Sequence, residues 1–290
     1  MVSLLIKEQC DDLTLGDIAL ATKQIRLISW NVNGLRAAHR KGLLEWLGQE
    51  QPDVLCLQET KSSPEQLPTE LRQPPGYHTY FASAQRKGYS GVALYSKVVP
   101  VQTSTSFGAS EYDDECRVII ADLGFFTVCN VYFPNGKASA ERLQYKLDFY
   151  EAFLCYLDRL NQKTPHIVVC GDVNTAHCEI DLARPRQNAK TSGFLPIERA
   201  WIDKLIAHGF IDTFRAFDQR PGQYTWWDLK TRARDRNVGW RIDYCFASEA
   251  LMPRIVSSSI LSDVVGSDHC PIVVNITTEE ASIIQKQISR

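Results

Sequence analysis

The residues of this chain best suited to chemistry are acidic and amide side chains placed directly after short apolar runs. Asn31 and Asn33 follow one such run, Glu59 follows a second, and Asp172 and Asn174 follow a third. Carboxylate and carboxamide oxygens are hard ligands, which select Mg²⁺ or Mn²⁺ over zinc. The pattern therefore points to a divalent-cation site, although each segment alone also fits an ordinary turn.

A histidine and further acids complete this set. Asp268 and His269 precede the apolar run 272–276, Asp243 lies within the run 241–247, and Tyr132 ends a third. An imidazole oriented by a carboxylate can donate a hydrogen bond to a phosphoryl oxygen or accept a proton. With a cation nearby, these groups are suited to metal-assisted hydrolysis of a phosphate ester.

These side chains can act together only if the elements that carry them end at one place. Short apolar runs predict strands at 25–30, 54–57, 91–95, 118–123, 125–132, 167–170, 224–227, 241–247, 255–261 and 272–276. Apolar stripes predict helices at 41–50, after Ser139 as far as Leu157, and at 196–208. If the strands run the same way in two paired sheets, the polar residues converge on one rim.

Length and composition agree with a single large domain. The chain has 290 residues, of which 44% are hydrophobic and 23% charged, and it contains no repeat or linker-like tract. We expect an acidic N-terminal extension at 1–23, able to form a short helix, one catalytic domain at 24–278 and a tail at 279–290. The expected class is mixed α/β, with two sheets packed face to face and helices outside.

The composition also excludes several classes of protein. Lys and Arg number 32 against 34 Asp and Glu, a net charge of −2, which argues against coating nucleic acid by bulk charge but not against a local basic face. No apolar run is long enough to cross a bilayer, and the start does not read as a signal peptide. The nine cysteines form no CxxC pair, as expected of free thiols in a reducing compartment.

Six segments spread along the chain combine these residues in short motifs. They are SWNVNGLR at 29–36, LQETK at 57–61, YFPN at 132–135, GDVN at 171–174, GWRIDY at 239–244 and GSDHCP at 266–271. In this order they resemble the motifs of the exonuclease III-type apurinic/apyrimidinic (AP) endonucleases of the endonuclease/exonuclease/phosphatase superfamily. The resemblance implies a four-layer α/β sandwich of two mixed β-sheets flanked by helices. It also implies Mg²⁺-dependent incision of DNA on the 5′ side of abasic sites, with Mn²⁺ able to substitute, and processing of blocked 3′ ends.

The resemblance further implies roles for individual residues. Metal ligands would come from Glu59, Asn33, Asp268, Asp172 and Asn174, and one-metal and two-metal use both stay open because some relatives have Asp at Asn33. The catalytic set would be Tyr132, Asp172, Asn174, Asp243 and His269. In it, Asp172 would orient or deprotonate the attacking water, and His269, held by Asp243, would contact the phosphate. Asn31 and Asn135 would also contact phosphate.

The substrate is expected to be double-stranded DNA bound by a monomer. Trp226, Trp240 and Ile242 would wall a pocket for a flipped-out abasic sugar, whereas Trp227 fits core packing better. DNA contacts are expected from Arg36, Lys61, Arg117, Lys137, Arg186, Asn188, Arg232 and Arg236.

Two other functions compete with this one. The first is a phosphatase or phosphodiesterase of the superfamily that acts on a non-DNA substrate, and the second is a non-catalytic DNA-binding descendant. The basic stretch around Arg232 and the complete polar set favour the nuclease. Such a protein would work in the cytoplasm or nucleoid of a prokaryote or in the nucleus of a eukaryote, and it would not be secreted.

Overall fold

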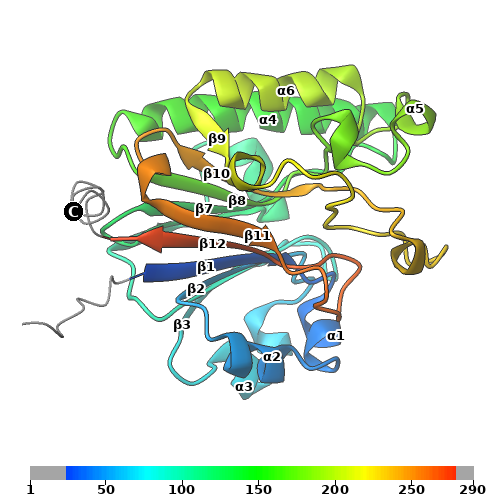
Figure 1. The fold of residues 1–290 in the computed structure, drawn as a ribbon. Coiled ribbons are helices and arrows are strands. Elements are labelled where there is room, and N and C mark those ends of the chain that lie inside the picture. The colour runs from blue at the N-terminus through cyan, green and yellow to red at the C-terminus, as the bar shows by residue number, and fades with distance from the viewer. Residues whose placement is uncertain (1–23, 279–290) are drawn as a thin grey trace, which may run out of the picture.

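The computed structural model describes residues 24–278, which form two six-stranded sheets packed face to face with helices outside (Figure 1). The expected four-layer α/β sandwich is confirmed. The extension at 1–23 and the tail at 279–290 lie outside the described residues. No helix within the described range is long and apolar enough to cross a membrane.

Both sheets are mixed, and their order brings distant parts of the sequence together. The first sheet runs β11 (Ile255–Ile260), β12 (Ile272–Thr277), β1 (Gln24–Asn31), β2 (Val54–Gln58), β4 (Val92–Ser96) and β3 (His78–Ala82). The second runs β5 (Gln102–Ser104), β6 (Val118–Asp122), β7 (Thr127–Tyr132), β8 (Ile167–Asp172), β10 (Asp243–Ser248) and β9 (Phe210–Asp212).

Strand direction places the polar strand ends at one edge. β1 is parallel to β2 and β7 is parallel to β8, so these strands end together. β10 and β12 run antiparallel to their neighbours, so they begin at the same edge, where Asp243 pairs with Asp172. The expected convergence therefore follows from parallel strands ending and antiparallel strands starting side by side.

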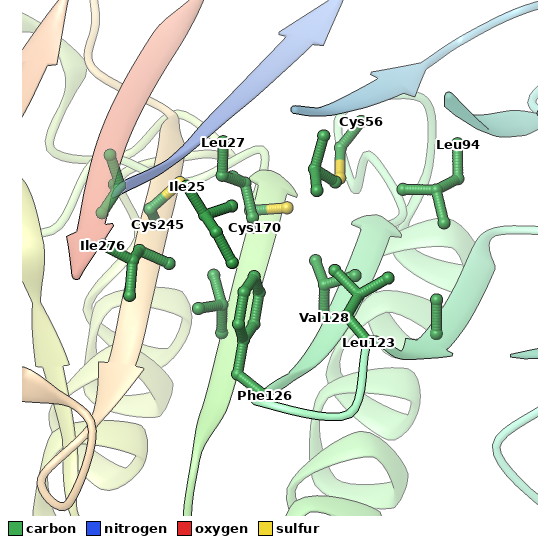
Figure 2. Close-up of a cluster of buried hydrophobic side chains, with 14 of the residues drawn as sticks. Ile25, Leu27, Cys56, Leu94, Leu123, Phe126, Val128, Cys170, Cys245 and Ile276 are labelled. Carbon is green, nitrogen blue, oxygen red and sulfur yellow. The ribbon is translucent and has the colours of Figure 1, made fainter. Parts of the chain in front are cut away.

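The central strands are buried on both faces, which explains their continuous apolar runs. Ile25, Leu27 and Cys56 meet Phe126 and Val128 between the sheets (Figure 2). Neighbouring residues on the same strands face the helices instead. All cysteines between residues 24 and 278 are free thiols, as expected.

Helices cover the outer face of each sheet (Figure 1). α1 (Leu35–His39), α2 (Leu43–Glu50) and α3 (Thr69–Arg72) lie beside the first sheet, and α4 (Ala140–Asn161) and α6 (Pro196–Ala207) cover the second. The short helices α5 (Pro185–Asn188) and α7 (Thr213–Phe217) belong to connecting segments. Ser139 caps α4 by accepting a hydrogen bond from the Arg142 amide at 3.2 Å.

The sequence-based prediction of elements was wrong or incomplete in several places. Residues 224–227 form isolated bridges to Trp240 and His269 and no strand, because they pair with loops at the rim. The strands β3, β5 and β9 were missed, since β5 and β9 are short and β3 is an edge strand with few buried residues. The buried stripe of α4 runs through Lys146, Phe149 and Phe153, while Leu143 and Leu147 are only half-buried.

Candidate active site

The polar strand ends meet where the two sheets come together. Asn31, the last residue of β1, donates from Nδ2 to Glu59 Oε1 at 3.0 Å and to Asp172 Oδ2 at 2.9 Å. Its Oδ1 accepts the amide of Asn33 at 3.0 Å. A single buried carboxamide thus connects an acid after β2 of the first sheet with an acid at the end of β8 of the second.

Several residues at this edge have unusual backbone conformations. The φ angles of Asn33, Glu59 and Asn174 are 44°, 51° and 56°, in the left-handed region. Asn tolerates this region, but Glu adopts it at a cost. Hydrogen bonds on both sides of Glu59 hold its turn, from Gly34 N to Glu59 O at 2.7 Å and from Thr60 N to Gly91 O at 3.0 Å. Such strain is typical of functional sites.

His269 is held by a buried carboxylate. Its Nδ1 lies 2.8 Å from Asp243 Oδ2, which also accepts the Thr225 hydroxyl at 2.6 Å. Burial by itself lowers the pKa of His269, but the carboxylate of Asp243 outweighs it and raises that pKa to about 10. The imidazole therefore carries a proton at neutral pH, and its Nε2 lies 4.0 Å from Asp172 Oδ2.

Asp172 is almost completely buried, with only 1% of its surface exposed. Burial, reinforced by the negative charge of Asp243, raises the pKa of Asp172 to about 8. Its Oδ1 accepts the amide of Asn174 at 2.8 Å, which fixes the carboxyl group. Without a bound cation, a carboxyl group of this pKa is mostly protonated at neutral pH; once ionised, it is a better proton acceptor than an ordinary carboxylate.

The Asn174 side chain is oriented by two residues of the segment 133–135. Its Nδ2 donates to Phe133 O at 2.9 Å, and its Oδ1 accepts Asn135 Nδ2 at 2.8 Å. Asn135 itself is exposed. The carboxamides of Asn174 and Asn135 therefore form a chain that runs from the buried acid toward the surface.

Arg117 does not lie where a DNA-contacting residue was expected. Its side chain is 2% exposed, and its guanidinium carbon lies 4.7 Å from the centre of the Tyr132 ring. It also donates to Tyr132 O at 3.0 Å and pairs with Glu115. Because these contacts bury the guanidinium group, we correct the expected surface position of Arg117 to one that supports Tyr132.

The Tyr132 hydroxyl stays protonated at neutral pH. Burial raises the pKa of Tyr132 well above its ordinary value, and the nearby Glu59 raises it further. The phenol is therefore available as a hydrogen-bond donor rather than as a phenolate.

Acidic and imidazole groups gather closely enough to hold a metal ion. Ligand atoms of Glu59, Asp172 and His269 lie within 4.8 Å of one another. The pKa of Glu59 is lowered, because Lys61 at 2.6 Å and Asn31 outweigh the opposing effect of burial. Glu59 is therefore an anion at neutral pH, as a metal ligand must be.

Asp268 lies beside this group rather than within it. Its Oδ1 accepts Asn33 Nδ2 at 2.9 Å and its Oδ2 accepts Trp226 Nε1 at 3.0 Å. Asn33 also accepts a hydrogen bond from Lys61. The candidate ligands thus form a central set, which consists of Glu59, Asp172 and His269, and an outer pair, Asn33 and Asp268.

A cavity of about 250 Å³ opens onto these residues. It is lined by Glu59, Asn135, Lys137, Asp172, Asn174, Thr191, Ser192, Gly193, Trp226, Trp240, Ile242, Asp268 and His269. The expected pocket residues therefore share one cavity with Glu59, Asp172, Asn174 and His269, whereas Asn31, Asn33, Tyr132 and Asp243 do not line it. Trp227 is buried elsewhere, against Arg234, as expected of a core residue.

Sequence reasoning missed two contributors. Thr225, which holds Asp243, and the cavity wall 191–193 belong to no quoted motif. One sequence feature could have indicated this part of the cavity: Gly193 lies shortly before Pro196, the predicted start of a helix.

The other expected DNA contacts are mostly accessible. Arg36, Lys137, Arg186, Arg232 and Arg236 are exposed, whereas Lys61 and Asn188 are half-buried. Lys137 also lines the cavity, and Lys61 pairs with Glu59 there. These side chains are free to approach a polyanion, except where Lys61 is engaged by the site itself.

Comparisons with known proteins agree with this geometry. Residues 28–269 match the model of the endonuclease/exonuclease/phosphatase family. An exodeoxyribonuclease of Bacillus subtilis is 45% identical over 256 residues, covering 87% of this chain and 100% of that protein. A DNA-(apurinic or apyrimidinic site) endonuclease of Dictyostelium discoideum is 40% identical, covering 87% and 70%. The structure of an AP endonuclease from Archaeoglobus fulgidus superposes with a TM-score of 0.78 at 32% identity, covering 86% and 98%.

Proposed function

Because this chain belongs to the endonuclease/exonuclease/phosphatase family, we propose that it is a Mg²⁺-dependent DNA-repair endonuclease. It incises the backbone 5′ to abasic sites and also processes 3′ ends, as exonuclease and 3′-phosphodiesterase. One observation carries the proposal: the buried acid Asp172 and the protonated His269 face the same cavity as Trp240 and Ile242. Hydrolytic groups and an aromatic wall are thus combined at one place.

Each of these residues has a separate role in hydrolysing a phosphodiester. Asp172, fixed by the Asn174 amide, orients the attacking water and accepts its proton. His269 donates from Nε2 to a phosphate oxygen, while Asp243 keeps it protonated. The Tyr132 hydroxyl donates to the phosphate or to the leaving oxygen, and Asn135 and Asn174 add carboxamide donors. Both amide hydrogens of Asn31 are engaged by Glu59 and Asp172, so Asn31 acts by holding these two acids in place.

The donor set fits a magnesium ion. Glu59 faces the cavity as an anion, the neighbouring donors are almost all oxygens, and no thiolate among residues 24–278 joins the central set. Glu59 and Asp172 would hold the ion, with Asn174 next to Asp172 and the Asn33–Asp268 pair outside this central group. When bound, the ion supplies positive charge that polarises the phosphate and stabilises the leaving oxygen.

The cavity wall accounts for selection of abasic sites. Trp226 and Trp240 meet at nearly right angles, with ring centres 6.5 Å apart, and Ile242 lies against them. A narrow apolar pocket accommodates a flipped-out abasic sugar but is too small for a nucleotide that carries a normal base. The exposed cations Arg36, Lys137, Arg186, Arg232 and Arg236 would bind phosphates along the duplex without reading sequence. We expect a monomer that works where DNA is kept, in a nucleoid or a nucleus.

An incision assay tests the proposal directly. Purified protein should cut a duplex that carries one tetrahydrofuran abasic analogue when Mg²⁺ is present, leaving a 3′-hydroxyl. The same protein should leave the undamaged duplex without an internal cut. Absence of incision by folded protein, combined with hydrolysis of a small phosphate ester, would favour a superfamily phosphatase with a non-DNA substrate instead.

A further inference from the structure

A charged residue on the buried face of α4 is not used by the proposed chemistry. Lys146 is 1% exposed, and its ammonium group donates to Asn174 O at 2.8 Å, Thr175 Oγ1 at 2.7 Å and Glu198 Oε1 at 2.7 Å. An ammonium group has only three donors, and all three are engaged. Lys146 therefore serves the protein's own backbone and side chains rather than a ligand.

Its partner closes the turn that leads into α6. Glu198 is fully buried, and its Oε1 accepts Ser192 Oγ at 2.9 Å in addition to Lys146. Its Oε2 accepts the amides of Gly193 at 2.6 Å and Leu195 at 3.1 Å. The carboxylate of Glu198 therefore fixes the segment 192–195 through hydrogen bonds, as the acidic residue of a helix capping box does.

The groups held by this pair form two walls of the cavity. Asn174 belongs to one wall, and Ser192 and Gly193 belong to the other. The walls approach closely, because a Cβ atom on Gly193 would lie 3.2 Å from Asn174 O and 3.4 Å from the Trp240 ring. Gly193 also has a φ of +96°, which disfavours any other residue there.

The left-handed backbone conformation of Asn174 sets the direction of its carbonyl. With a φ of 56°, its carbonyl points at Lys146 while its side chain joins Phe133 and Asn135. Burying a lysine and a glutamate together costs desolvation energy, and an apolar pair of similar volume is often at least as stable. Stability alone therefore gives a weak reason for an ion pair at this place.

We propose that Lys146 and Glu198 are positioning residues, which set the spacing between Asn174 and the 192–193 wall and thereby align the substrate phosphate with Asp172. The inference rests on the proposed function, since alignment has meaning only for a bound phosphodiester. Neither side chain touches the substrate, and both act through Asn174 and Gly193.

The test compares Lys146→Met, Glu198→Gln and the double variant with the wild type. Lys146→Met should lower kcat for incision of the abasic duplex by about 10- to 100-fold, with KM changed by less than about threefold. Lys146→Met also leaves the buried carboxylate of Glu198 without its positively charged partner, so the Tm of this variant should fall. The double variant removes both charges, so its Tm should recover while kcat stays low.

Two controls separate positioning from general damage. Lys204→Met removes an exposed pair with Glu151, at 2.6 Å and 54% exposure of each side chain, that links the same two helices away from the cavity. Leu157→Ala opens a hole in the buried face of α4 and lowers Tm without touching the cavity. Both controls should keep the wild-type kcat at temperatures where they are folded.

Three outcomes would overturn the proposal: wild-type kcat in folded Lys146→Met, recovery of kcat together with Tm in the double variant, or an equal loss of kcat in Leu157→Ala. The NMR signals of the Asn174 side-chain amide and the Gly193 backbone amide give a readout that needs no turnover. They should shift in Lys146→Met and stay in place in Lys204→Met, and unshifted signals in Lys146→Met would refute positioning. Failure of the wild type to incise DNA would refute the proposed function alone.

Discussion

The pair formed by Asp243 and His269 offers a quantitative test of how the site is charged. The two side chains are buried, and Asp243 Oδ2 lies 2.8 Å from His269 Nδ1. Asp243→Asn keeps the shape of the side chain and its ability to hydrogen-bond but removes the negative charge. Burial would then lower the pKa of His269, opposed only by the weaker effects of the Asp172 and Asp268 charges.

The size of the effect follows from the geometry. Two unit charges 2.8 Å apart attract by about 6 kcal/mol at an effective dielectric constant of about 20. At 1.36 kcal/mol for each pKa unit, this equals about four units. The pKa of His269, about 10 in the wild type, should therefore fall to about 6 in Asp243→Asn.

The sign of the pH dependence is then fixed. Wild-type His269 keeps its proton as pH rises to about 9, and the stability that its charge adds is fully present below the ordinary pKa of 6.5 and is lost as pH rises from there through about 10. In Asp243→Asn the proton leaves as pH rises through about 6. Incision by the variant should therefore fall about tenfold for each pH unit above that point, until a residual rate is reached.

The assay has two parts and a matched control. NMR titration of the imidazole signals, in protein kept free of metal, gives the pKa of His269, and incision of the abasic duplex between pH 5.5 and 9 gives the activity profile. Asp203→Asn is the control, because Asp203 is 70% exposed and raises the pKa of His177 outside the cavity. A His269 that stays protonated at pH 8 in Asp243→Asn would refute the reasoning.

The remaining predictions concern the acid, the metal, the DNA track and the pocket. Asp172→Asn should lower kcat by several orders of magnitude with DNA affinity kept, and equal loss of both would give Asp172 another role. Since burial raises the pKa of Asp172 to about 8, its ionisation opposes folding as pH rises from its unfolded value. The metal-free Asn variant should therefore melt at a higher temperature than the wild type at pH 8 and at an equal temperature near pH 3, measured by calorimetry. EDTA should abolish incision and added Mg²⁺ should restore it, whereas activity that survives chelation would contradict a metal site. Arg232→Ala should reduce the slope of log affinity against log salt by about one, in a binding titration. Trp240→Ala should reduce the ratio of kcat/KM for the abasic duplex to kcat/KM for the undamaged duplex. An unchanged ratio would show that Trp240 does not help to select abasic sites.

The sequence predicted the fold class and most central strands, because those strands are buried on both faces and read as unbroken apolar runs. β5 and β9 could not be found in this way, since strands of three residues carry too little pattern. Residues 224–227 look like a strand because Tyr224 and Trp227 are apolar and buried, but their neighbours in space are loops. Local pattern cannot distinguish burial against a loop from burial in a sheet.

Among the site residues, sequence pattern placed the polar strand ends but not the residues that hold them. Arg117 looked like a surface cation, because nothing local reveals that Tyr132 and Glu115 enclose it. The unusual position of Lys146 can be detected in the sequence, since it lies on the apolar stripe of α4 between Leu143 and Tyr150. A lysine at such a position indicates a buried partner, but its identity, Glu198, depends on the packing of two helices.

The position of β12 has a consequence for how the protein is made. β12 lies between β11 and β1, so within residues 24–278 the first strand pairs with the last. His269 and Asp268 lie in the segment just before β12, while Asn31 ends β1. A growing chain can therefore hold the early acids and amides before the segment that carries the imidazole has been made. We expect nuclease activity to arise only after β12 has been made and has paired with β1.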